Sequence, residues 1–124
     1  MRRARAFTLI ELLVVLAILA TLLALALPRY FGSVERAKET TLRTSLAVLR
    51  EAIDKYHADT GRYPEALEEL VARRYIRALP VDPVTESAAT WITLPPPGGE
   101  RGGVYDVRSG AEGKTAGGTP FGEL

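Results

Sequence analysis

Residues 7–27 read FTLIELLVVLAILATLLALAL, an apolar run of 21 positions that carries a single charge, Glu11. An α-helix rises roughly 1.5 Å per residue, so this run is long enough to cross a hydrocarbon core of about 30 Å. It is also too apolar to belong to the core of a small domain. The stretch therefore predicts a membrane-spanning helix near the start of the chain.

The charges around this run predict its orientation. Arg2, Arg3 and Arg5 precede it, and no basic cluster follows it directly. Cytoplasmic flanks of membrane helices carry the excess of lysine and arginine, so the N-terminus is expected in the cytoplasm. The rest of the chain would then face the periplasm or the cell exterior.

Two simpler interpretations compete with anything more specific. An ordinary single-pass anchor leaves Glu11 unexplained, since an ionised carboxylate inside the bilayer is costly unless it snorkels to the headgroups. A cleaved secretory signal would use Ala24-Leu25-Ala26 as its small-x-small cleavage site. Against that signal, the run is longer than a usual apolar signal segment, and Pro28 lies just beyond the scissile bond.

The remainder of the chain offers little catalytic or nucleic-acid-binding chemistry. From residue 28 onward it has 13 basic and 14 acidic residues, and hence no basic face for nucleic acid. The chain has no cysteine, which removes disulfides and thiolate metal sites. Its one histidine, His57, fits a surface position better than a ligand, and no phosphate-binding loop or nucleophile elbow is present. We therefore expect no enzymatic activity.

The pattern after residue 28 predicts an α+β fold, in which a long N-terminal helix packs on a small antiparallel β-sheet head. Pro28 is expected to break or kink the helix. The helix then resumes from Gly32 to about His57 with one apolar stripe, and Gly61 supplies a left-handed cap. The stripe consists of Leu42, Leu46, Leu49, Ile53 and Tyr56.

Short elements complete this head. Residues 64–73 predict a second helix that buries Leu67, Leu70 and Val71. Runs 90–94 and 104–108 predict two strands, separated by a Pro/Gly-rich loop. The apolar face of the sheet is expected to include Trp91, Ile92, Val104 and Tyr105.

The start of the chain resembles a known processing site. Arg5-Ala6-Phe7-Thr8-Leu9-Ile10-Glu11-Leu12-Leu13 is similar to the site in type IV pilins and in the pseudopilins of type II secretion systems. The resemblance implies cleavage between Ala6 and Phe7 by a membrane aspartyl peptidase, which then methylates the new amino group of Phe7. The family usually has Gly where this chain has Ala6, and Ala is the nearest steric substitute.

The same resemblance implies an assembly role for Glu11. In the family this acid faces the new amino terminus of an adjacent subunit, so that a carboxylate within the membrane gains a cationic partner. Such pairing lowers the cost of burying the acid and sets the register between subunits. Snorkelling of Glu11 toward the headgroups remains the alternative.

Later motifs are most like the G-type major pseudopilin of type II secretion. Gly61-Arg62-Tyr63-Pro64, then residues 79–83 (LPVDP) and 103–109 (GVYDVRS), follow the order of that branch. Members of the branch commonly bind one calcium ion in the C-terminal loop, which suits oxygen ligands. The resemblance places that site at Asp106, Ser109, Glu112 and Glu123. Glutamate stands where the branch usually carries aspartate, and the alternative is a Gly-rich loop held by its own turns and by Phe121.

Three regions and one function follow from the resemblance. The first region is a cleaved leader, residues 1–6. The second is a membrane and filament-core helix, residues 7–27. The third is a periplasmic region, residues 28–124, and the whole chain is expected to be an inner-membrane protein. The expected function is that of a structural subunit of the type II secretion pseudopilus. Its partners would be copies of itself, minor pseudopilins, the prepilin peptidase/methyltransferase, the platform protein and the assembly ATPase. A type IV pilin or minor pilin, or a membrane-anchored periplasmic binding module, remains as an alternative.

Overall fold

The computed structural model describes residues 6–99 and 101–124, so the predicted leader lies outside the described residues except for Ala6. The described elements are two α-helices, two short strands and two 3₁₀ turns. They are α1 (Leu9–Thr60), α2 (Leu67–Ala72), β1 (Ile92–Leu94), η1 (Pro97–Gly99), β2 (Asp106–Arg108) and η2 (Phe121–Glu123). The long helix and the small sheet confirm the predicted α+β class.

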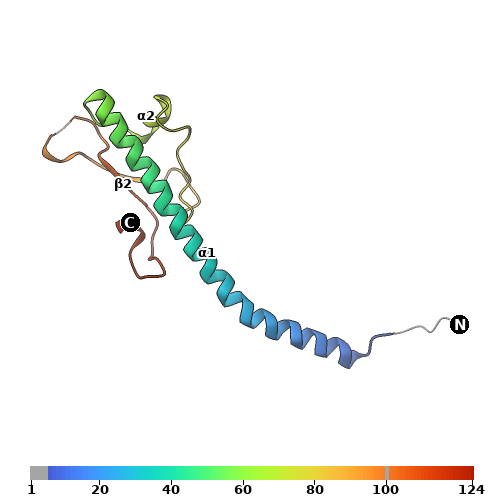
Figure 1. Cartoon of the computed structure of the whole chain (residues 1–124). Coiled ribbons are helices and arrows are strands. Elements are labelled where there is room, and N and C mark those ends of the chain that lie inside the picture. Colours follow the sequence, from blue (N-terminus) through green and yellow to red (C-terminus); the bar gives the residue numbers. More distant parts are fainter. Residues whose placement is uncertain (1–5, 100) are drawn as a thin grey trace. The chain divides into compact units, whose positions relative to one another are not determined.

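The chain divides into two compact units, residues 1–34 and 35–124. We call the second unit the head domain. It contains the C-terminal part of α1, and Figure 1 shows α2, β2 and the C-terminal segment gathered around that green part of the helix.

Helix α1 differs from the prediction at Pro28. The helix runs from Leu9 to Thr60 with Pro28 inside it, so this proline does not end the helix. Proline removes one N–H and so one hydrogen bond. Long helical runs on both sides make the other bonds and keep the segment helical. The break expected at this position is wrong.

The far end of α1 is closed as predicted. Gly61 has φ +76°, and its N–H donates to the His57 carbonyl at 2.9 Å. This is the five-to-one bond of a left-handed cap, which glycine adopts without a steric penalty. The chain reverses here and returns along the helix.

The predicted stripe forms the core of the head domain. Each stripe residue is at most 1 % exposed, because residues three or four apart share one face of a helix. Around the stripe, apolar side chains from the later elements close the core. They are Leu67, Leu70, Trp91, Val104, Val107 and Phe121, with Ala52 from α1 itself.

The second helix and the sheet are shorter than predicted. Helix α2 covers six residues, and Val71 is only half-buried. The strands pair antiparallel with Thr93 opposite Val107. Ile92 and Tyr105, expected on the buried face, are 52 % and 45 % exposed, whereas Val107 is fully buried. Adjacent residues of an extended chain point to opposite faces, so of the expected pairs 91/92 and 104/105 only Trp91 and Val104 are buried.

Two glycines allow the C-terminal half of the head domain to approach its neighbours. A Cβ on Gly102 would lie 2.2 Å from the Tyr63 carbonyl oxygen, and one on Gly110 would lie 2.1 Å from that of Thr90. Gly102 also has φ +113°, which L residues rarely adopt. Backbone contact at these points sets how the loop after η1 and the segment after β2 pack.

Candidate functional site

The start of α1 is organised around a side-chain cap. The Glu11 N–H donates to Thr8 Oγ1 at 3.2 Å, and the Leu12 N–H donates to the Thr8 carbonyl at 3.2 Å. Thr-x-x-Glu has the spacing of a capping box, in which a side chain satisfies a donor at the helix start. The helix therefore begins just after Thr8. Ala6 and Phe7 precede it in exposed, non-helical backbone.

Phe7 and Glu11 lie on the same side of this helix start. Together with Ile10, Val14 and Val15 they line one hollow on its surface. Phe7 is 87 % exposed and Glu11 is exposed as well. Within residues 6–99 and 101–124, no cation pairs with the Glu11 carboxylate. The structure thus brings the two predicted assembly residues together and leaves the acid available to a partner outside this chain.

The apolar half of α1 exposes all of its side chains. Every residue from 7 to 27 is exposed, and the most apolar window has a mean hydropathy of 2.8 with none of it buried. Soluble monomers rarely expose so large a continuous apolar surface. A helix with such a surface requires lipid or other apolar helices around it. The membrane helix predicted from the sequence has the same requirement.

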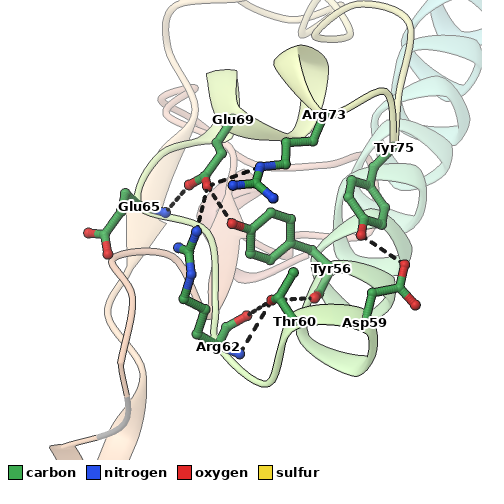
Figure 2. Close-up of polar contacts among 8 residues, drawn as sticks. All are labelled: Tyr56, Asp59, Thr60, Arg62, Glu65, Glu69, Arg73 and Tyr75. Atoms are coloured by element: carbon green, nitrogen blue, oxygen red, sulfur yellow. Dashed lines mark hydrogen bonds and ion pairs between the residues drawn. The ribbon is translucent and has the colours of Figure 1, made fainter.

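A polar network joins the end of α1 to α2 in the head domain. Figure 2 shows the Glu69 carboxylate at its centre, with Tyr56, Arg62 and Arg73 pointing toward it. The Tyr56 hydroxyl and Arg62 Nη2 both donate to Glu69 Oε1, the latter at 3.1 Å. Arg73 Nε lies 3.8 Å from the same oxygen. The Glu65 N–H donates to Glu69 Oε2 at 2.8 Å, so both carboxylate oxygens have donors.

These contacts shift the pKa values of the side chains in the network in opposite directions. The hydrogen bond from Tyr56, then those from the Glu65 N–H and Arg62, lower the pKa of Glu69. Burial and the bond to Glu69 raise the pKa of Tyr56. The Tyr75 hydroxyl donates to Asp59 at 2.8 Å, and this bond raises the pKa of Tyr75. The network favours the ionised form of Glu69 and joins the end of α1 to α2.

The four predicted calcium ligands do not converge in the structure. Asp106 Oδ1 accepts hydrogen bonds from Arg50 Nε and from the Val107 N–H. The Ser109 hydroxyl is buried and donates to Asp82 at 2.5 Å, while Glu112 and Glu123 are exposed. In the described part of the chain, no three His, Cys, Asp or Glu side chains are grouped to hold a metal ion.

Calcium usually takes six to eight oxygen ligands. The side chains around Asp106 do not fit such a site, since the one central carboxylate is already paired with a cation. Calcium binding therefore stays a prediction.

Two residues that the sequence analysis did not single out organise the C-terminal segment. Arg50 contacts it directly from α1. Asp82, fully buried, accepts the Ser109 hydroxyl on one oxygen and the N–H groups of Val84 and Thr85 on the other. In the sequence, the position of Asp82 before a proline indicated a turn. Nothing in the pattern indicated that Asp82 is buried or that its partner Ser109 lies 27 positions away.

The fold and the N-terminal site define a class: an α+β chain with one long helix, apolar and exposed in its first part, and a head domain packed on its second part. Two family models match the chain, the prokaryotic N-terminal methylation motif over residues 1–27 and the type II secretion system protein G over residues 29–121. The chain therefore belongs to the type II secretion system protein G family, as the resemblance predicted.

Individual relatives agree with this placement. The chain is 38 % identical over 99 residues to the type II secretion system core protein G of Klebsiella pneumoniae, covering 67 % of this chain and 71 % of the relative. It is 35 % identical to the Pectobacterium carotovorum protein of the same name, covering 65 % and 62 %. It is 34 % identical to that of Vibrio cholerae, covering 67 % of each. No solved structure matches the chain significantly.

Proposed function

We propose that this protein is a structural subunit of the type II secretion pseudopilus and that it acts by polymerising. The observation that carries the proposal is the fully exposed apolar segment of residues 7–27, with one acid near its start, joined to a head domain that has its own core. Such a helix becomes stable only among lipids or other apolar helices. A subunit that passes from membrane to filament exchanges the first environment for the second.

Processing would prepare the chain for assembly. The peptidase removes residues 1–6, and the exposed Phe7 then carries a new, methylated amino group. The arginine-rich leader holds the N-terminus in the cytoplasm and places the head domain in the periplasm. Membership of the family and the methylation-motif match support inner-membrane anchoring and peptidase processing.

Glu11 would then pair with an adjacent subunit in the filament. Its carboxylate lies beside Phe7 on an otherwise apolar surface. Within lipid an ionised acid is costly, so a cation from an adjacent subunit is strongly favoured beside it. The new amino group of the adjacent Phe7 is that cation. Because the pair forms at one position only, it also sets the register between helices.

The assembly partners follow from this role. Copies of the chain form the filament, and minor pseudopilins join it. The platform protein and the cytoplasmic ATPase supply the energy from the inner membrane, so the subunit itself requires no active site. Growth of the polymer pushes secreted proteins toward the outer membrane.

Replacement of Glu11 by Gln tests the pairing, because it removes the charge and keeps the shape. We expect loss of filament assembly, measured as sheared or cross-linked multimers, with unchanged amounts of processed monomer in the membrane. Glu35→Gln is the matched control, since Glu35 is an exposed glutamate of the same helix outside the apolar half. Normal filaments from Glu11→Gln would exclude the proposed role.

Mass spectrometry of the mature N-terminus separates the remaining interpretations. Methylated Phe7 supports the pseudopilin, an intact Met1 supports a plain anchor, and a start at Leu27 supports a secretory signal. Deletion of the gene then separates the two filament types. We expect loss of protein secretion with normal twitching, whereas the reverse result would indicate a type IV pilin.

A further inference from the structure

Arg50 connects α1 to three points of the C-terminal segment, residues 106–124. Its Nε donates to Asp106 Oδ1 at 2.9 Å. Its Nη2 donates to the Val107 carbonyl at 2.9 Å and to the Leu124 oxygen at 2.8 Å. These partners are 56, 57 and 74 positions away, so one side chain joins the helix to β2 and to the residue that follows η2.

The guanidinium suits this arrangement. It is planar, always charged and has five N–H donors in a fixed fork, of which the three contacts use one on Nε and two on Nη2. The ion pair is half-buried, with 36 % of the Arg50 side chain and 32 % of the Asp106 side chain exposed. Partial removal from water strengthens a charge-assisted hydrogen bond relative to one at the open surface.

The three acceptors are a carboxylate oxygen and two main-chain oxygens. Oxygen atoms of these kinds are the ligands that a hard divalent cation takes in proteins. In this structure the three oxygen atoms already contact a cation that belongs to the chain itself, the guanidinium of Arg50. A main-chain oxygen left without a donor in such a place would be destabilising, and Arg50 donates to two of them as well as to the carboxylate of Asp106.

We propose that Arg50 is the cation that fixes the C-terminal segment to α1, so that the head domain reaches its full stability without a divalent metal ion. Ser109 and Asp82 secure the start of the same segment, and Phe121 secures its end in the core. The contacts of Arg50 flank these two attachments, because Asp106 and Val107 precede Ser109 and Leu124 follows Phe121. It determines whether β2 and the final residues are held to the helix as one piece.

Thermal unfolding of the full chain in detergent micelles tests the proposal, followed by the fluorescence of Trp91, which is the single tryptophan and is buried in the head domain. The wild-type melting temperature is expected to be the same with millimolar calcium chloride and with chelator. Arg50→Gln is expected to lower it by on the order of 5 °C or more. Arg50→Lys, which keeps the charge but loses the fork, is expected to fall between the two.

Arg43→Gln is the matched control. Arg43 is another arginine of α1, whose exposed pair with Glu39 at 3.0 Å lies within the helix, and such pairs contribute little. A local readout accompanies the melting curves: trypsin cleavage after the exposed Lys114 is expected to be faster in Arg50→Gln and unchanged in Arg43→Gln.

Two results would overturn the proposal. One is a wild-type melting temperature that calcium raises by several degrees. The other is an Arg50→Gln protein that melts and is cleaved like Arg43→Gln. If Arg50→Gln does not fold, Asp106→Asn takes its place with a smaller shift expected in the same direction, and a melting temperature equal to that of the wild type would count against Arg50.

Discussion

The two halves of α1 differ in composition and have opposite surroundings. In residues 7–27, leucines occur on every side of the helix, and all are exposed. In the head domain the leucines keep to one stripe, and that stripe is fully buried. The difference teaches that the chain itself can cover apolar side chains that are few and confined to one stripe, whereas a helix that is apolar all round needs apolar surroundings from outside the chain.

The largest expected effect contrasts one leucine from each half. Leu49→Ala removes a fully buried side chain and should lower the free energy of unfolding of the head domain by about 2–5 kcal/mol. Leu16→Ala, at a 53 % exposed position, should change it by less than about 0.5 kcal/mol. Chemical denaturation in detergent, followed at Trp91, measures both. Equal losses would show that the two halves are not distinct environments.

A smaller and pH-dependent effect is expected at Glu69, a residue of α2 that accepts a hydrogen bond from Tyr56 near the buried end of α1. Its pKa is lowered in the folded state, so its stabilisation is complete above the pKa of an unfolded glutamate, about 4.3, and is lost as the pH falls through the folded pKa. Glu69→Gln should therefore be less stable than the wild type at neutral pH. The free energies of unfolding of the two proteins should become equal in strong acid.

Unfolding curves between neutral pH and strong acid provide that measurement. Glu51→Gln is a suitable control, because Glu51 forms only an exposed pair with Lys55 among the described residues. A difference between wild type and Glu69→Gln that stays constant down to strong acid would contradict the role given to the charge.

The smallest expected effect concerns the end of α1. Gly61→Ala places a Cβ on a residue with φ +76°, although nothing lies within 4 Å of that Cβ. The cost is then purely one of backbone conformation, roughly 1 kcal/mol. Gly102→Ala is the comparison, because it adds a collision with the Tyr63 carbonyl to the same kind of strain. A Gly61→Ala protein as unstable as Gly102→Ala would show that space at the cap is not open.

Much of the fold could be predicted because its signals are local. The stripe from Leu42 to Tyr56 follows the helical period, and the Gly61 cap follows from a residue type. The predictions failed where local preference competes with context. Pro28 is tolerated inside a long helix, and short strands with few residues left the register around Val107 and Tyr105 open.

The candidate site divides in the same way. Thr8 and Glu11 act through neighbours in sequence, so the cap and the placement of Phe7 beside Glu11 follow from spacing. Arg50, Asp82 and Glu69 act through partners elsewhere in the chain. A charged residue beside an apolar stripe has many possible partners, and no pattern within one sequence selects among them.

By itself, then, the amino-acid sequence determined the apolar helix, the buried stripe and the family, because hydrophobic periodicity and a contiguous motif are carried by adjacent residues. Only the tertiary structure decided that Arg50 meets Asp106, Val107 and Leu124, and that Ser109 faces Asp82 instead of its expected companions. The physical reason is that a hydrogen bond depends on distances of a few tenths of an ångström, which packing alone establishes.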